Sequence, residues 1–322
     1  MGYGQGLGNL GRDVRDQMIY PGPIMSGEVF HCFAADCEQS NSAYFTKLAG
    51  GLVKLGSTAI ADALADCTDN AGDMIVLHGG GGDWSLTSAL TVNKGRLKIM
   101  DSSVWLRMLT GVWTPSDAQV TFTPATAIDL FTVTQDNVQF MGLDIRADLT
   151  AAQGNIFALD SSAAANCAIL GGQLVITNAT VRCIGIECDA PDLMVKDWKF
   201  LSPNNVDPTT GHFAIVLNGA RCEVSDCLIL MDDAAGRGVH MESGADGCRV
   251  LNNYFHMEGT TGDTGVLIDS GATYNVVRGN DFNAALNADI TNNGGATNQI
   301  IGNNNLTLIA NNSATTASLT VI

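Results

Sequence analysis

Short runs of alternating apolar and polar residues fill most of the chain from residue 72 onward. Clear examples are the segments Val250–Phe255 and Val277–Phe282. In both, an aliphatic residue is followed three positions later by Asn, and an apolar residue comes two positions after that. Alternation with a period of two is typical of strands, and Asn suits corners because it tolerates a left-handed backbone conformation. The pattern predicts short strands separated by tight polar corners.

These units of strand and corner repeat along the chain. Gly-Ala pairs precede the last four units at spacings of 25, 27 and 24 residues, beginning at Gly219, Gly244, Gly271 and Gly295. A period of 20–30 residues that contains strands and no helical stretch is typical of a β-solenoid. We therefore expect an all-β chain that coils into stacked turns.

One polar residue at each corner is expected to bond to its counterpart in the next turn. The pattern assigns this position to Asn253, Asn280 and Asn304, and to Asp226 in a unit where Glu223 occupies the aliphatic position. Stacked side chains of this kind form a ladder along the corner. We predict a structural corner ladder through these four residues.

A single helix precedes the repeats. Ile60, Ala63, Leu64 and Cys67 recur at helical spacing, and Ser57 or Thr58 can cap the first turn. We predict a capping helix near 57–68 that covers the first open end of the solenoid. The glycine run at 79–82 lacks the Lys-Ser/Thr pair of a phosphate-binding loop, so we interpret it as a tight turn.

Residues 1–28 differ from the rest of the chain. Five glycines between residues 2 and 11 and the Pro21-Gly22-Pro23 segment exclude a continuous helix or a central strand there. Two interpretations are open, a start that frays in solution and an extended arm that orders on a partner or on a sister subunit. The second is favoured by apolar side chains, of which we assign capsid or subunit contact to Tyr3, Leu7, Leu10, Ile19 and Tyr20. The predicted organisation is an anchoring arm at 1–28 followed by one β-helix domain at 29–322.

The charge balance excludes two classes of partner. The 322 residues include 33 Asp and Glu against 16 Lys and Arg, a formal net charge of −17, and no Lys follows residue 200. Nucleic-acid binding requires a basic face, and so does binding to an anionic membrane surface.

No apolar run approaches the roughly 20 residues of a membrane span, and the start lacks the basic and apolar regions of a signal peptide.

Nine cysteines in a chain without a recognisable export signal suggest reduced and mostly buried thiols. The pairs Cys183/Cys188 and Cys222/Cys227 have a spacing that a zinc site could use. Their neighbours alternate as strand residues do, which favours burial over metal binding. We expect no metal and no cofactor.

The order of these features resembles a known superfamily. A capping helix, the Gly72-Asp73-Met74-Ile75-Val76 segment, a glycine-rich turn and units with Gly-Ala pairs and Asn corners resemble the right-handed parallel β-helix of the pectate-lyase-like superfamily over about 55–312. With its glycine-rich arm, acidic charge and cysteines, the layout is most similar to bacteriophage structural proteins, namely head-decorating or spike proteins that hold a capsid by the N-terminal segment.

The resemblance implies a right-handed parallel β-helix that assembles in the host cytoplasm and resides in the virion. It further implies a homotrimer whose partner is the major capsid protein or another virion component. The apolar segment from Trp105 to Trp113 is either a flap packed on the rod or part of such an interface.

Polysaccharide cleavage is the enzymatic alternative on this fold. Glycoside hydrolysis needs two carboxylates that flank the scissile bond. Polygalacturonase-type hydrolases carry Asn-Thr-Asp, Asp-Asp, Gly-His-Gly and Arg-x-Lys motifs, whereas this chain has one Asp-Asp pair and His240 between Val239 and Met241. We therefore expect no catalytic residues. The alternative is a tailspike-like glycan-binding protein or depolymerase with a surface glycan as partner, whose candidate acids are Asp232, Asp233, Glu242, Glu258 and Asp263.

Overall fold

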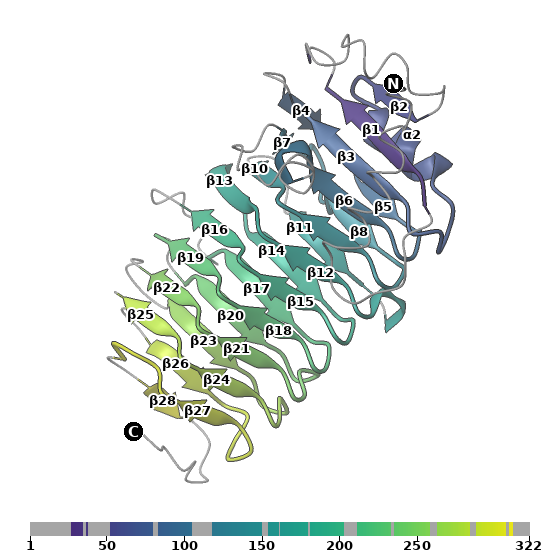
Figure 1. The fold of residues 1–322 in the computed structure, drawn as a ribbon. Coiled ribbons are helices and arrows are strands. Elements are labelled where there is room, and N and C mark those ends of the chain that lie inside the picture. The colour runs from purple at the N-terminus through teal and green to yellow at the C-terminus, as the bar shows by residue number, and fades with distance from the viewer. Residues whose placement is uncertain are drawn as a thin grey trace, which may run out of the picture.

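In a computed structural model, the chain is a parallel β-solenoid, as the repeat predicts (Figure 1). The structure describes residues 27–34, 37, 52–79, 83–104, 118–149, 154–160, 162–179, 181–202, 211–232, 235–257, 263–283, 288–306 and 309–311. Three parallel sheets, named A, B and C here, run along the rod, and the chain visits them in turn.

Sheet A extends along the full length of the rod. Its eleven strands within the described residues are, in spatial order, β2 (Val53–Leu55), β1 (Val29–Phe33), β3 (Met74–His78), β6 (Lys98–Asp101), β9 (Gln139–Met141), β12 (Ala168–Leu170), β15 (Met194–Lys196), β18 (Glu223–Ser225), β21 (Arg249–Leu251), β24 (Val276–Arg278) and β27 (Gln299–Ile301).

Sheets B and C complete each turn. The described strands of sheet B are β4 (Asp83–Leu86), β7 (Gln119–Phe122), β10 (Asp144–Leu149), β13 (Gln173–Ala179), β16 (Lys199–Ser202), β19 (Leu228–Met231), β22 (Tyr254–Met257) and β25 (Asp281–Asn283). Those of sheet C are β5 (Leu90–Val92), β8 (Phe131–Val133), β11 (Gly154–Leu159), β14 (Cys183–Cys188), β17 (Phe213–Leu217), β20 (Arg237–Met241), β23 (Thr264–Ile268), β26 (Ala288–Asn292) and β28 (Ile309–Asn311). A 3-10 helix, η3 (Ser162–Ala164), lies between β11 and β12.

Strand register shows how the repeat in the sequence maps onto the turns. In sheet A, Val224 pairs with Val250, Val250 with Val277, and Val277 with Ile300. These inward-facing residues follow one another at 26, 27 and 23 residues, which agrees with the spacing of the Gly-Ala pairs to within one residue. Each turn of this region therefore corresponds to one repeat of the sequence.

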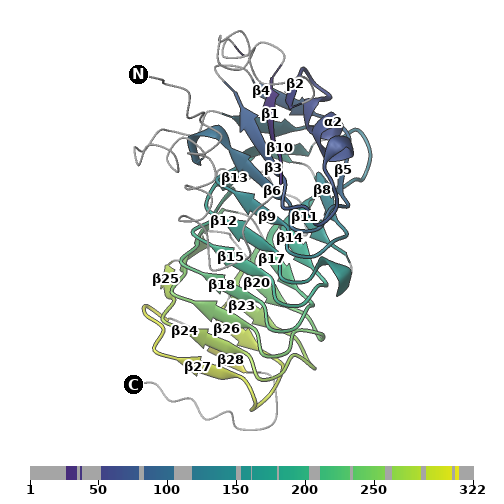
Figure 2. The same cartoon turned by 45° about the vertical axis from the view of Figure 1, so that its right-hand side comes forward.

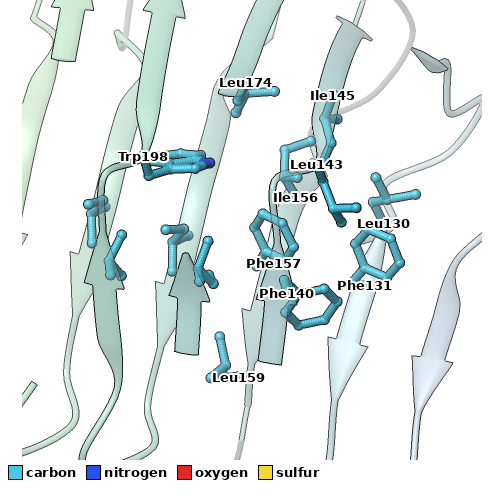
Figure 3. Close-up of a cluster of buried hydrophobic side chains, with 14 of the residues drawn as sticks. Leu130, Phe131, Phe140, Leu143, Ile145, Ile156, Phe157, Leu159, Leu174 and Trp198 are labelled. Carbon is cyan, nitrogen blue, oxygen red and sulfur yellow. The ribbon is translucent and has the colours of Figure 1, made fainter. Parts of the chain in front are cut away.

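The interior is filled by side chains from all three sheets. Phe131, Phe140 and Phe157 form an aromatic cluster with ring centroids 4.8–5.5 Å apart (Figure 3). Farther along the rod, Phe255 and Phe282 stack at 4.9 Å. Each buried ring contributes roughly 1.5–3 kcal/mol relative to exposure. Within the described residues, the main core is continuous from the first turns to the last.

Two glycines of sheet C lie where any side chain would clash with this aromatic core. A Cβ atom on Gly238 would lie 2.7 Å from the Phe255 ring, and one on Gly265 would lie 2.6 Å from Phe282. Both distances are below any normal carbon contact, and the nearest backbone oxygens would lie 2.4 Å from a Cβ on Gly238 and 2.8 Å from one on Gly265. The glycines thus let the aromatic side chains of sheet B reach across the interior to sheet C.

The helix α2 (Ala59–Asp66) lies at the N-terminal end of the rod beside β1, β2 and β3 (Figure 2). It buries Ile60, Ala63 and Leu64 against the first turns. It is shorter than the predicted 57–68, because Thr58 is only the N-cap residue and Cys67 already has extended backbone geometry. Its position supports the predicted capping role.

Sheet A carries a second apolar layer at this end. Met74, Val76 and Met100 are buried in a cluster of their own, separate from the main core. They alternate with Ile75, Leu77 and Ile99, whose side chains belong to the main core. Both faces of sheet A are therefore buried at the first turns, which explains why β3 reads as a continuous hydrophobic run in the sequence.

Candidate functional site

A corner ladder runs along the boundary between sheets A and B. Asn253 Oδ1 accepts the backbone N–H of Cys227 at 2.9 Å, and its Nδ2 donates to the Val224 carbonyl at 3.0 Å. Asn280 repeats the arrangement one turn later, accepting from Asn253 N at 2.9 Å and from Asn253 Nδ2 at 3.0 Å. Each amide therefore joins consecutive turns through side-chain and backbone bonds.

At the two outer positions of the predicted ladder, the structure has the adjacent residue in place of the predicted one. Val224, and not Glu223, pairs with Val250, which brings Cys227 instead of Asp226 into the ladder. Asp226 lies at the exposed corner with φ of 56°.

The same shift occurs at the C-terminal end, where Ile300 pairs with Val277 and places Asn303 in the ladder instead of Asn304. In this unit either isoleucine can take the aliphatic position and either Asn303 or Asn304 the corner position, but only the frame with Asn304 ends on an apolar residue, Leu306.

A second ladder, which the sequence analysis did not identify, lies between sheets C and A. Its members each precede a strand of sheet A. Asn275 Oδ1 accepts the backbone N–H of Cys248 at 2.8 Å, and Asn298 Oδ1 accepts that of Asn275 at 2.9 Å. The signal was present as a Cys or Asn directly before Glu223, Arg249, Val276 and Gln299.

The cysteines serve this architecture as buried thiols. All nine are free and buried. Cys248 Sγ donates to the Gly219 carbonyl at 3.2 Å, the kind of bond that Asn275 Nδ2 makes to Ala245 one turn later. Burial raises the pKa of Cys227 to about 12, so this thiol stays protonated and is a poor nucleophile. In the described part of the chain, no three His, Cys, Asp or Glu side chains form a group that could hold a metal ion.

The described acids proposed for glycan cleavage do not form a pair of the required spacing at sheet C. Asp263 is fully buried before β23, where its Oδ1 accepts the backbone N–H of Gly236 at 3.1 Å. Glu242 follows β20, the neighbouring strand, and so lies at the opposite end of these strands. Five residues of strand span about 16 Å, more than the separation of roughly 5–9.5 Å in glycosidases. Asp232 follows β19 in sheet B and is half-buried.

Several predicted residues lie outside the described part of the chain. They are Asp233 and Glu258 among the candidate acids, Trp105 and Trp113 of the apolar segment, and the arm residues Tyr3, Leu7, Leu10, Ile19 and Tyr20. Of residues 1–28, the structure describes Gly27 and Glu28. Glu28 N donates to Asp73 Oδ1 at 2.7 Å beside β3.

The outer face of sheet C carries an arginine-aromatic cluster that the sequence analysis also missed. The guanidinium carbon of Arg182 lies 4.4 Å from the centroid of the Phe213 ring, and that of Arg237 lies 5.9 Å from it. His240 meets the same ring edge-on at 5.7 Å, and its Nε2 bonds to Asp269 Oδ2 at 2.9 Å. These residues come from successive turns, so only the stacking of the solenoid brings them together.

A group of carboxylates surrounds Glu187 of β14 in the same sheet. Burial, followed by the charges of Asp189, Asp129 and Asp160, raises the pKa of Glu187. Asn155 donates to Glu187 from the adjacent strand β11. Arg182 and Arg237 lie where β14 and β20 begin, whereas Glu187 lies near the end of β14, and Asp160 and Asp189 follow β11 and β14.

A buried histidine pair lies at the N-terminal end. His31 Nδ1 and His78 Nε2 are 2.9 Å apart, and His78 stacks on Phe33 at 4.4 Å. Burial lowers the pKa of His31 to about 4, and burial together with His31 lowers that of His78 to about 3. Both rings are therefore neutral at pH 7.

Among the described residues, no helix combines the length and apolar character needed to span a membrane.

No protein-family model and no curated protein matches the sequence. Among solved structures, the chain is similar to ORF18 of Geobacillus virus E2, with a TM-score of 0.45 and 11% sequence identity over 80% of this chain and 56% of that one. The chain therefore spans little more than half the length of the protein it matches.

Proposed function

We propose that this protein is a virion structural protein, a phage head decoration or spike protein that acts as a rigid, non-catalytic rod. The observation that carries the proposal is the unbroken sheet A, whose strands run from β2 to β27 over one continuous core. Eleven strands at the usual spacing of about 4.8 Å give a rod of roughly 50 Å. Ladders between turns make such a rod stiff, which suits a spike or a cement between capsid subunits.

Attachment through the first end of the rod is part of this proposal. The anchoring arm at 1–28 leads directly into β1, which pairs with β2 and β3. Gly27 supports a fixed entry point, since a Cβ there would lie 2.3 Å from the Gly72 backbone. The apolar arm residues then face the major capsid protein or a sister chain, and the C-terminal end of the rod points away from the particle.

Two measurements test the role and the attachment. Quantitative mass spectrometry of purified virions is expected to find the protein in a fixed ratio to the major capsid protein. A variant lacking residues 1–24 retains Gly27 and Glu28, so we expect it to fold with unchanged thermal stability and to be missing from particles. Absence of the full-length protein from virions would refute the role, and unfolding of the truncated variant would refute the separate arm. Analytical ultracentrifugation of the full chain tests the homotrimer.

A glycan-binding spike is the second candidate, favoured by the arginine-aromatic cluster on sheet C. A depolymerase would clear host capsule and lose that activity in Asp232→Ala or Asp233→Ala. A binding protein would adhere to the glycan without cleaving it, and a purely decorating protein would do neither.

A further inference from the structure

The strand β19 of sheet B consists entirely of apolar residues. Ile229 and Met231 belong to the main core, whereas Leu228 and Leu230 lie on the outer face and remain half-buried. A continuous apolar run is typical of a strand that is covered on both faces. At β3, which has a similar run, the apolar side chains on the outer face are fully buried. Within the described residues, the outer face of β19 lacks the complete cover that β3 has.

The apolar outer surface of β19 continues into the adjacent turns. Val175 of β13 pairs in register with Leu201 of β16, and Leu201 pairs with Leu230 of β19. On the other side, Leu228 pairs with Tyr254 of β22, which exposes 36% of its surface. Residues paired in register point to the same face of a sheet. These five residues therefore form one continuous area over four consecutive turns, which we call the sheet B patch (Figure 1).

A row of alternating charge borders the sheet B patch on the strand β10. The row consists of Asp144, Arg146 and Asp148, and register places Asp144 beside Gln173 and Arg146 beside Val175 of the patch. Alternate residues of a strand are roughly 7 Å apart, and no ion pair among the described residues uses these three side chains. Both signs of charge are therefore available for pairing on this face.

A second copy of this chain fits both the sheet B patch and the charge row. Copies related by a rotation axis parallel to the rod meet at equal heights, because each has the same strands at the same spacing of about 4.8 Å. The patch of one copy then faces the patch of the other, and the two charge rows face each other. A row that alternates in sign is self-complementary, since a shift of two residues brings Arg146 of one copy opposite a carboxylate of the other.

We propose that the outer face of sheet B is an interface between copies of this chain, with the sheet B patch at its centre and the charge row of β10 beside it. Burial of the leucines of both copies stabilises the interface, and the paired charges fix the register of the two rods. This inference rests on the self-association included in the proposed function, and it names the face that carries it. A dimer and a trimer are both consistent with it.

Analytical ultracentrifugation of the purified full chain and of matched variants tests this interface. Leu230→Asp adds a charge to the patch and Arg146→Glu makes the charge row uniformly acidic, and we expect each to raise the dissociation constant of the oligomer at least tenfold. The controls are Leu251→Asp and Arg249→Glu, since both residues lie on the outer face of β21 in sheet A. These two variants should associate as the wild-type chain does, and circular dichroism verifies that every variant is folded.

Cross-linking gives a second measurement with a milder change. All nine native cysteines are buried, so a short bismaleimide is expected to link copies of Leu230→Cys and not copies of the control Leu251→Cys.

The possible failures are distinguishable. A wild-type chain that is monomeric throughout the concentration range would overturn both this interface and the homotrimer, while mass spectrometry of virions decides the virion role separately. An oligomer that persists in Leu230→Asp and Arg146→Glu, or that is cross-linked only through Leu251→Cys, would overturn this interface alone.

Discussion

Successive turns of the solenoid fill the same corner position with different chemistry. Between sheets A and B, register places Trp198, Cys227, Asn253, Asn280 and Asn303 at equivalent points. At Trp198 the corner side chain is apolar and adds to the core, and from Asn253 onward it is an amide that bonds to neighbouring turns. The thiol lies between the two regions and combines small apolar volume with a weak donor.

This difference shows that the corner backbone does not require one side chain. Burying Trp198 stabilises its turn through contact with Phe200, whose ring centroid lies 6.0 Å away. Asn280 instead satisfies buried backbone groups of its neighbours. Apolar corners tolerate substitution by other apolar residues, whereas an amide corner is specific because each unsatisfied partner costs roughly 1–3 kcal/mol.

The largest effect is expected in the apolar region. Phe157→Ala removes a ring packed at 4.8 Å from Phe140 and 5.5 Å from Phe131. We expect the free energy of unfolding to fall by about 3–5 kcal/mol, because loss of contact and a cavity act together. Urea unfolding followed by circular dichroism measures the change. Phe157→Leu is the matched control and should lose less, and a loss below 1 kcal/mol in the alanine variant would contradict the packing argument.

Asn280→Ala tests the amide region of the corner between sheets A and B. This change leaves the backbone N–H of Asn253, its Nδ2 and the Val250 carbonyl without the bonds that Asn280 supplies. A loss of about 3 kcal/mol is expected in the same urea experiment. Asn283→Ala, an exposed amide in the neighbouring strand β25, should change stability by less than about 0.5 kcal/mol. Equal effects of the two variants would mean that the ladder contributes nothing beyond a surface amide.

Acid is expected to distinguish the two ends of the rod. The pKa of His31 is about 4 in the folded chain and 6.5 in the unfolded chain. The unfolded chain therefore takes up a proton that the folded chain does not, and stability decreases as the pH falls from 6.5 to about 4. A difference of this size corresponds to about 3 kcal/mol, and the lowered pKa of His78 acts in the same direction.

Hydrogen exchange at pH 7 and pH 4.5 locates the loss. We expect β1 and β3 to lose protection at pH 4.5 while β21 and β24 keep theirs. His256→Gln, on the outer face of sheet B, is the control and should leave this pattern unchanged. Uniform loss of protection along the rod would contradict a local origin at the histidine pair.

The sequence predicted the architecture well because each turn repeats the same inward aliphatic residue at a nearly constant spacing. Val250 and Val277 identified their turns correctly, together with the ladder residues Asn253 and Asn280. The predicted ladder residue was one position too early at Asp226 and one position too late at Asn304. Local alternation does not reveal which of two adjacent residues faces the neighbouring turn.

The arginine-aromatic cluster was not predicted for a different reason. Arg182, Phe213 and Arg237 are separated by 31 and 24 residues, and nothing in their local sequence distinguishes them from other strand ends. Their proximity depends on the exact number of residues in two intervening turns, including residues 203–210, which lie outside the described part of the chain. A repeat pattern gives the order of the turns and leaves the alignment of outward side chains undetermined.

The smallest effect is expected in the ladder between sheets C and A, at Cys248, the last thiol before Asn275. Cys248→Ala removes the thiol bond to the Gly219 carbonyl and should lower the free energy of unfolding by about 1 kcal/mol. Cys248→Asn extends the amide ladder by one turn, because Asn275 already shows how an amide at this corner accepts the preceding backbone N–H. We expect this variant to be at least as stable as the alanine variant in urea unfolding. Greater instability of the asparagine variant would show that the corner at Cys248 is too small for an amide. Side-chain volume, and not hydrogen bonding, would then decide at which turn asparagine replaces cysteine in the ladder.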